Sequence, residues 1–493
     1  MSNQKQKKDL YYVHSAIGLA IMAIFWFLPP VEPITPIGMK CVGIFIGMVY
    51  LWSMVDTLWP SILGLFLFGI SGYDPAGFNS VWMNSIGNFT VLLTMFACIL
   101  FGAVHEVGDT MYIAQWFLTK KIFKGRPWVF LAIWFACCAV VSALIGPIVG
   151  LIILWPIALS LMKTLNITRE DKVWPWFFVG TFLINTLMQP FFPFMGAQLV
   201  PLSAFQGMTA QMYGAPLAVP MAQYMITNAT MSALIMAIYM AAMKFIIRVD
   251  VSKLQAIDPD MVKTQLNLPP INKVQIIYLV MIPIYISALL IPSFIPNNPI
   301  CQFLLSIGSL GVTVLTVAIF LIVKVDGKPL LDFKEMAYKQ LPWGIFFMIA
   351  AAVYGANSLS NASTGVTAFL LQVLNPILGG LGETAFVAVL FLVALIITNF
   401  ANNAAMAVVL MPVVLAFSQQ MNLNPIPVAM GVTLMVFVAM LTPAASPHAG
   451  MMHGRKDIYT TGEILKIGLP MCLVTWALYV FVGYPMMKLL LGV

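Results

Sequence analysis

The chain has 493 residues, of which 61% are hydrophobic and only 8% charged, and its formal net charge is +7. Soluble domains carry about a quarter charged residues, so this composition excludes a soluble globular protein and predicts a membrane protein with roughly a dozen spans. The six cysteines and four histidines show no CxxC or HExxH spacing, and no P-loop or nucleophile elbow occurs. These absences argue against a metal site, an ATP-driven pump and most hydrolases. The basic residues fall in short loops, where they set membrane orientation and do not indicate nucleic acid.

The first half of the chain reads as apolar segments separated by short polar ones. Three lysines in the first nine residues precede an apolar run at 11–28 without a small-residue cleavage site, so we expect a retained first helix and a cytoplasmic N-terminus in the cell membrane. Residues 87–109 are apolar but end in a polar run, which indicates either a re-entrant hairpin or a loop at a membrane face. The basic loop 120–126 is expected to be cytoplasmic. A proline-rich broken segment follows at 189–196.

One charged stretch, residues 248–273, divides the chain near its middle and is expected to be a cytoplasmic linker. It would separate a first membrane repeat, 1–247, from a second, 274–493. The two halves echo each other: residues 101–103 resemble 354–356, residues 155–157 resemble 411–413, and Pro190 matches Pro443, at offsets of 253, 256 and 253 residues. These landmarks predict an internal duplication, and an odd number of spans in each half would invert the second repeat relative to the first.

Two polar interruptions in the second half carry the functional prediction. Thr398, Asn399, Asn402 and Asn403 lie within six positions of an apolar region, and a proline-rich break follows at 442–448. Amides and freed carbonyls are tolerated at membrane depth only where protein satisfies them or where they line a wet cavity. Neighbouring helices alone could satisfy such a kink. Two broken segments that face one cavity are, however, how secondary transporters build an ion and substrate site.

The chain resembles the divalent anion/sodium symporter family of dicarboxylate permeases, within the ion transporter superfamily, most clearly over residues 343–453. That family carries a Ser-Asn-Thr motif in each half, shortly before a proline, and a Thr-Pro-Pro motif after a proline break. Here Asn402-Asn403-Ala404, ten residues before Pro412, and Ser446-Pro447-His448 stand at the second-half places. The first half departs from the pattern, because Gly146-Pro147-Ile148 has neither amide nor hydroxyl.

The resemblance implies an all-α fold of inverted repeats, with about eleven spans, broken helices and two re-entrant hairpins, near 87–109 and 342–365. It also implies a homodimer with elevator-type motion of a transport domain against a scaffold. The implied function is secondary active transport of a small organic anion, such as a dicarboxylate, by alternating access. The protein would be no enzyme and would need no cofactor beyond Na⁺.

The resemblance also assigns residues. The candidate substrate ligands are Asn402, Asn403, Thr442, Ser446, Pro447, His448, Gly146 and Pro147. The candidate sodium ligands are Thr398, Asn403 and the carbonyls of Ala401 and Ala445. Ser142 and Gly146 mark a weakened first-half site. Sodium prefers oxygen ligands, and the first-half motif lacks the amide and hydroxyl that would supply them. We therefore expect at most one sodium site, in the second half.

Alternatives remain at the level of the sequence. His448 either meets an anion, carries a proton or is a hydrogen-bonded structural residue. Glu106 and Glu383 either carry protons in place of sodium or are hydrated near an interface. The protein would then be a proton-coupled transporter or an uncoupled exchanger of the same fold. A channel would show charge rings or repeated carbonyl filters, and a membrane enzyme would need a metal or nucleophile cluster; the chain shows neither.

Overall fold

The computed structural model describes residues 2–194 and 196–493, and its side chains from residue 10 onward except 265 and 293. The lysines of the N-terminal nine residues and Met195 of the first broken segment therefore lie outside the described side chains. Helices dominate this part of the chain, whose one sheet is the antiparallel pair β1 (Lys324–Val325) and β2 (Lys328–Pro329). Eleven of the described helices are long and apolar enough to cross a membrane. The predicted all-α polytopic membrane fold is confirmed.

The helices of the first half and the linker are α1 (Ser2–Phe27), α2 (Pro36–Met54), α3 (Leu58–Ile70), α4 (Phe78–Ile86), α5 (Phe89–Val107), α6 (Asp109–Leu118), α7 (Pro127–Ile145), α8 (Pro147–Thr164), α9 (Val173–Met188), α10 (Leu199–Tyr213), α11 (Met221–Ala241) and α12 (Pro259–Leu266). Those of the second half are α13 (Lys273–Leu290), α14 (Pro299–Ile322), α15 (Phe333–Lys339), α16 (Trp343–Ser360), α17 (Val366–Leu378), α18 (Glu383–Thr398), α19 (Asn403–Gln420), α20 (Pro425–Val436), α21 (Pro447–Gly454), α22 (Thr461–Leu478) and α23 (Tyr484–Leu491).

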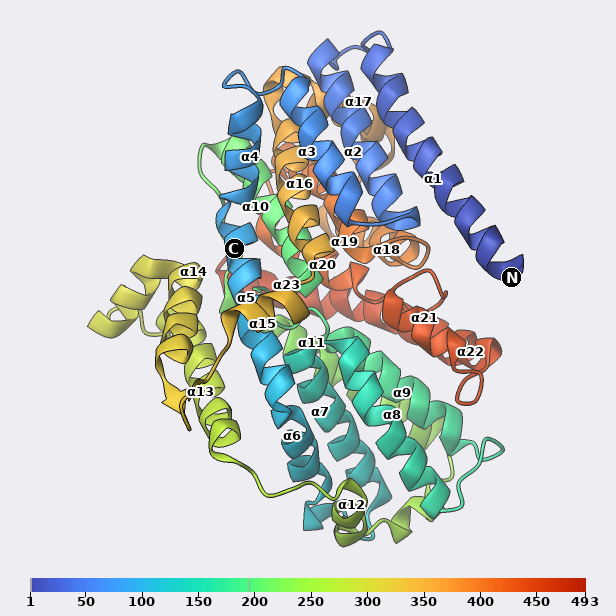
Figure 1. Cartoon of the computed structure of the whole chain (residues 1–493). Helices are drawn as coiled ribbons and strands as arrows, with labels where there is room; N and C mark the ends of the chain where they lie inside the picture. Colours follow the sequence, from blue (N-terminus) through green and yellow to red (C-terminus); the bar gives the residue numbers. More distant parts are fainter. Residues whose placement is uncertain (1, 195) are drawn as a thin grey trace.

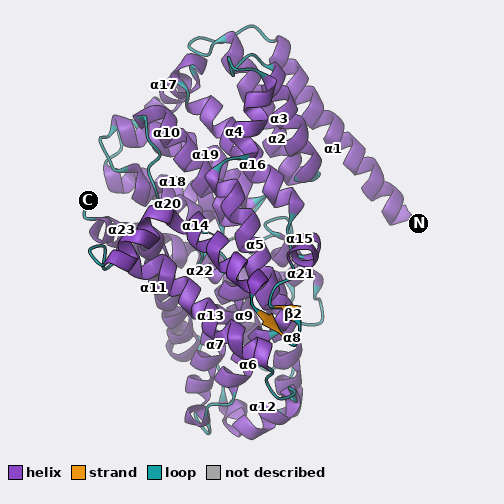
Figure 2. Ribbon diagram, turned by 60° about the vertical axis from the view of Figure 1, so that its left-hand side comes forward, coloured by secondary structure: helices purple, strands orange, loops and turns teal. Residues whose placement is uncertain are grey.

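The helices form an upper and a lower group that meet at the middle of the molecule (Figure 1). Helices α1–α4, α16 and α17 lie in the upper group, α6–α9 and α12 lie in the lower group, and α21 and α22 stand beside the junction. Figure 2 shows α1 leading away from the body to the N-terminus. Its apolar side chains, such as Ile24 and Phe27, are exposed. An uncovered apolar helix of this kind suits contact with lipid.

Helix bounds follow the internal repeat that the sequence predicts. Helices α8 and α19 begin 256 residues apart, at Pro147 and Asn403, and each has a proline in its interior, at Pro156 and Pro412, again 256 residues apart. Helices α11 and α22 both continue into a five-residue π-helix. In Figure 1, α5 descends from α4 to α6 whereas α16 rises from α15 to α17, as expected of inverted repeats. The limits of the two repeats and of the linker stay predictions.

The predicted positions of the two re-entrant hairpins are wrong. Residues 89–107 and 343–360 each form one continuous helix, α5 and α16, both long enough to span. The polar residues that suggested a hairpin tip lie instead at a helix end: Glu106, in the last turn of α5, pairs with Lys339 of α15 at 3.0 Å. The chain turns back elsewhere. Helices α7 and α8 pack against each other and are joined by Gly146 alone, and α18 and α19 are joined by residues 399–402.

Both broken segments are confirmed. The chain is non-helical from Gln189 to Phe194, after α9, and from Phe437 to Ser446, between α20 and α21. Prolines limit helix continuation in both segments because they lack the N–H donor. The two breaks and the two helix reversals therefore meet near the middle of the molecule.

Candidate functional site

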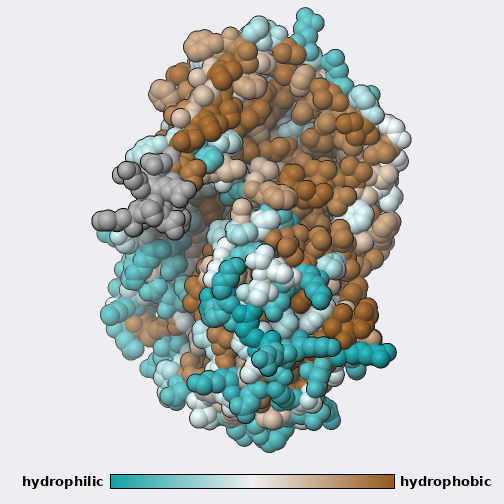
Figure 3. All heavy atoms as spheres, turned by 90° about the vertical axis from the view of Figure 1, so that its right-hand side faces the viewer, coloured by the Kyte–Doolittle hydropathy of each residue, from teal (hydrophilic) through white to brown (hydrophobic). Residues whose placement is uncertain are grey.

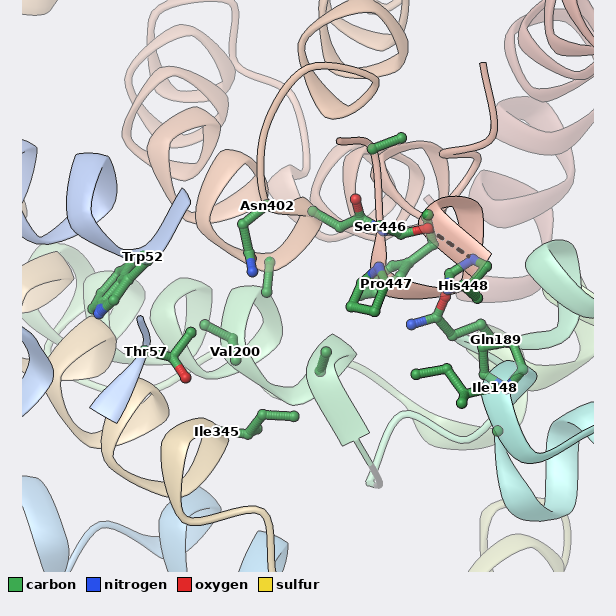
Figure 4. Close-up of a pocket in the computed structure, with 18 of the residues that line it drawn as sticks. Trp52, Thr57, Ile148, Gln189, Val200, Ile345, Asn402, Ser446, Pro447 and His448 are labelled. Atoms are coloured by element: carbon green, nitrogen blue, oxygen red, sulfur yellow. Dashed lines mark hydrogen bonds between the residues drawn. The ribbon is translucent and has the colours of Figure 1, made fainter. Parts of the chain in front are cut away.

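A cavity of about 730 Å³ lies where the two halves of the chain meet. We call it the central cavity; Figure 4 shows it in close-up. Its lining comes from the ends of α2, α7, α9 and α20, from the starts of α8, α10, α16, α19 and α21, and from the second break. Seven of the eight predicted substrate residues line it together: Gly146, Pro147, Asn402, Asn403, Ser446, Pro447 and His448. Two of the predicted sodium ligands line it as well, Ala445 and Asn403, the latter common to both sets. No Asp, Glu, Lys or Arg is among the described residues that line this cavity.

Three helices have their first residue in the lining of the central cavity: α8 with Pro147, α19 with Asn403 and α21 with Pro447. The first-turn N–H groups of a helix have no intrahelical acceptor, and the N-terminus of a helix carries about half a positive charge. The capping residues take up only part of this capacity. These helix starts are a source of positive potential for the cavity, although none of its described side chains is a fixed cation.

Asn402 caps α19 and still offers a donor to the cavity. Its Oδ1 accepts the N–H of Ala405 at 3.1 Å. Because the two ends of an amide point in opposite directions, its Nδ2 is left to face the cavity, as Figure 4 shows. Asn402 is therefore placed both to fix the helix start and to donate to a bound carboxylate.

The second break is held together by side chains that the sequence singles out. Asn399 Oδ1 accepts the N–H groups of Met440 at 3.1 Å and Leu441 at 2.8 Å, and its Nδ2 donates to Leu395 at 2.7 Å. Thr442 donates its hydroxyl to the Asn399 carbonyl and is not part of the cavity lining. The freed backbone groups of the break are thus satisfied by protein, which is what membrane depth requires.

Ser446 and His448 form a bonded pair at the start of α21. The Ser446 hydroxyl accepts the N–H of Ala449 at 3.1 Å as the helix cap and shares a hydrogen bond of 3.1 Å with His448 Nε2. The His448 ring is 1% exposed and stacks on Phe182, with ring centroids 5.4 Å apart. This position suits a packed, hydrogen-bonded histidine at the cavity wall.

Two of the predicted sodium ligands, Thr398 and Asn403, lie in contact at the start of α19. The Thr398 hydroxyl is 3.0 Å from Asn403 Oδ1 and also within hydrogen-bond reach of the Val436 carbonyl, and Thr398 is fully buried. Ala445 and Asn403 line the central cavity, whereas Thr398 and Ala401 do not. The donor set is oxygen only, which fits a hard cation.

The first half contributes two amides that the sequence reading missed. Ser142, at the predicted weakened site, donates to the Asn185 carbonyl at 2.8 Å and lies behind the lining. Asn185 is fully buried, and its Oδ1 has no hydrogen-bond partner in the described part of the chain. Gln189 lines the cavity, with its amide beside Pro447 and His448 in Figure 4 and its Oε1 equally unpartnered there. The sequence signal that could have identified Asn185 is an amide side chain within the otherwise apolar helix α9.

The two glutamates considered as proton carriers lie elsewhere. Glu106 pairs with Lys339, and Glu383 pairs with Lys488 at 2.6 Å and accepts the Tyr484 hydroxyl at 2.9 Å. Neither lines the central cavity. Lysines neutralise the charges of both glutamates, and these ion pairs join helices. Neither glutamate therefore supplies an acidic group to the central cavity.

Comparison with known proteins agrees with an anion permease. A family model described as "citrate transporter" matches residues 48–435. An "uncharacterized transporter", YfbS of Escherichia coli (strain K12), is 31% identical over 146 residues, which cover 30% of this chain and 23% of that relative. The narrower resemblance to the divalent anion/sodium symporters stays a prediction. Since the family match covers most of the chain and includes both helix reversals, the protein belongs to the citrate transporter family.

Proposed function

We propose that the protein is a secondary active transporter that carries a small organic polycarboxylate, citrate being the example that its family suggests, across the cell membrane. The observation that carries this proposal is the convergence of the starts of α8, α19 and α21 on a cavity without charged side chains. Helix N-termini and the Asn402 amide bind a carboxylate without a fixed cation. Such a site holds the anion weakly enough to release it.

Alternating access is supported by the position of the cavity. It lies between the two halves of the chain, at two helix reversals and two broken segments in corresponding places. In secondary transporters this arrangement lets one part move against another around the bound substrate. The exposed apolar faces of α1 suit lipid contact and the proposed homodimer equally well.

Coupling to one sodium ion is the second part of the proposal. Thr398, Asn403 and the carbonyls of Ala401 and Ala445 offer oxygens behind the start of α19. In the first half, the Ser142 hydroxyl is engaged and the place of the amide is taken by Gly146. The free Asn185 Oδ1 alone is too few ligands for a cation.

Uptake into proteoliposomes tests both parts. Labelled citrate, with other di- and tricarboxylates as competitors, should accumulate saturably under an inward sodium gradient and exchange for internal substrate in counterflow. Failure of every carboxylate to be taken up or exchanged would reject the transport proposal. Uptake that is indifferent to sodium but follows a proton gradient, or occurs only as exchange, would reject sodium coupling alone.

A further inference from the structure

A second cavity, of about 510 Å³, adjoins the central one along the contact of two helices. We call it the outer cavity; α8 supplies Ile152, Trp155 and Pro156, and α21 and its end supply Met451, Gly454 and Arg455. In the central cavity α8 supplies residues 147–149 and α21 supplies residues 447, 448 and 450. On each helix, the residues that line the outer cavity begin within one turn of the residues that line the central cavity. We call the line of contact between these two helices the α8–α21 seam; both cavities lie along it.

Arg455 is the one charged residue in the lining of the outer cavity, as far as the chain is described. Its guanidinium lies 5.4 Å from the Trp155 ring centre and binds Asp457 through two hydrogen bonds, of 2.8 and 2.6 Å. Trp155 is 2% exposed, and its Nε1 donates to Tyr459 at 3.0 Å, so this aromatic platform is fixed. The cation is thus held in place, with its side chain 37% exposed.

Helix α21 has eight residues and so is about 12 Å long. Its N-terminus faces the central cavity, and Arg455 stands just past its other end. The face that carries α21 and α22 looks toward the viewer in Figure 3, where hydrophilic residues gather over the lower half and apolar residues over the upper half. Arg455 itself is partly exposed, so this end of the outer cavity reaches the protein surface.

We propose that the outer cavity is a second anion-binding site, in which Arg455, stacked on Trp155, captures a carboxylate before it passes along the α8–α21 seam. This inference rests on the proposed function and adds a site outside the central cavity. Arginine binds carboxylates in a forked geometry and draws anions toward a site by its field. Asp457 competes for the same guanidinium, which keeps the outer site weak and lets the anion move on.

A labelling experiment tests the site without any substrate. Position 152 is 55% exposed on the seam, so Ile152→Cys should react with membrane-impermeant methanethiosulfonates from water. We expect Arg455→Gln to lower, and Asp457→Asn to raise, the ratio of anionic to cationic reagent rates by roughly two- to fivefold, as for a partly exposed charge. Both effects should fade at about 1 M salt, where the screening length is about 3 Å.

The controls use the same chain. The parent protein without the added cysteine gives the background, because five of its six cysteines are buried and the other is half-buried. Lys466→Gln removes an exposed charge from α22 outside the outer cavity and should leave the ratio unchanged. Arg455→Lys keeps the charge and should keep most of the ratio. A cysteine that does not react, or a ratio unmoved by both Arg455→Gln and Asp457→Asn, would overturn the inference.

Substrate kinetics separate this inference from the proposed function. Arg455→Gln should raise the KM for citrate uptake two- to fivefold at low salt, with most of the effect in KM, and citrate should slow labelling of the introduced cysteine. An unchanged KM in a transporting protein counts against the outer site alone. A reagent ratio that responds in a protein that transports no carboxylate supports the anion site while the transport proposal fails.

Discussion

Three substitutions of Asn402 separate its two roles, as the cap of α19 and as a donor to the central cavity. Serine and aspartate cap helices about as well as asparagine, whereas alanine does not. Asn402→Ser therefore keeps the bond to Ala405 N–H, 3.1 Å in the native chain, but removes the amide donor. Asn402→Asp keeps the cap and replaces that donor with a negative charge. Asn402→Ala removes both.

The expected magnitudes differ enough to be told apart. Loss of a hydrogen bond to a charged ligand costs about 1.5–3 kcal/mol, so Asn402→Ser should weaken citrate binding roughly ten- to hundredfold. Repulsion between two carboxylates about 4 Å apart at an effective dielectric constant of about 20 is about 4 kcal/mol, so Asn402→Asp should weaken it roughly a thousandfold. Only Asn402→Ala should also lower the free energy of unfolding, by about 1 kcal/mol.

The assay pairs citrate counterflow in proteoliposomes with thermal unfolding of the same purified variants. We expect Asn402→Asp to unfold no earlier than the native protein, since a negative cap also suits the helix N-terminus. If Asn402→Asp transports citrate with a native KM, Asn402 does not face the substrate and the assignment of the central cavity is wrong. If all three variants unfold early, the residue is structural and the transport loss carries no information on binding.

Three further predictions concern the surroundings of the site. Asn403→Ala should abolish the sodium dependence of uptake whereas Pro147→Ala should leave it intact, and sodium dependence that survives Asn403→Ala would remove this residue from the cation site. Asn399→Ala leaves the buried N–H of Met440 and the part-buried N–H of Leu441 without their acceptor and should lower the free energy of unfolding by about 1–3 kcal/mol or more; a native unfolding temperature would contradict the role of its amide in the second break. Burial raises the pKa of Asp109, at the start of α6, to about 7, so the native protein loses stability as pH rises toward 7. Asp109→Asn should therefore be more stable than the native chain at pH 8 and similar near pH 4, as measured by thermal unfolding in detergent.

Hydropathy predicted the fold class because every backbone group in lipid must be satisfied within its own segment, which leaves long apolar helices as the sequence signature. The same reasoning misplaced the hairpins. Polarity at the end of α5 reflects the contact of Glu106 with Lys339, a residue 233 positions away in the chain, and composition cannot distinguish such a contact from a hairpin tip. The observed reversal at Gly146 was marked by its Gly-Pro pair, a signal of local geometry.

The sequence predicted those residues of the candidate site that lie at helix starts and at the second break. Asn402 and Asn403 are amides within an apolar stretch, Ser446 is a hydroxyl directly before Pro447, and the structure brings all three to one cavity. Asn185 and Gln189 were missed because their direction depends on how α9 is rotated against α8. Gly150 shows how close that packing is, since a Cβ there would lie 2.9 Å from Asn185 Oδ1. Only tertiary structure fixes such a rotation.

The two halves of the chain differ in the residue that precedes the helix at the central cavity: an asparagine side chain stands before α19, whereas only backbone is present at the glycine before α8. At the start of α19, Asn402 has φ −55° and ψ 123°, a conformation open to any residue, and its amide both caps and donates. At the start of α8, Gly146 has φ 81° and ψ 165°, a backbone conformation that residues with a Cβ atom rarely adopt. An asparagine at 146 would therefore strain the reversal between α7 and α8. Under the proposed function, the first half would hold the anion through backbone N–H groups and Gln189, while the second half would supply the oxygens for a cation. The predicted duplication would give two similar helix starts, and the backbone conformation at Gly146 explains why α8 has no amide at the position that Asn402 holds before α19.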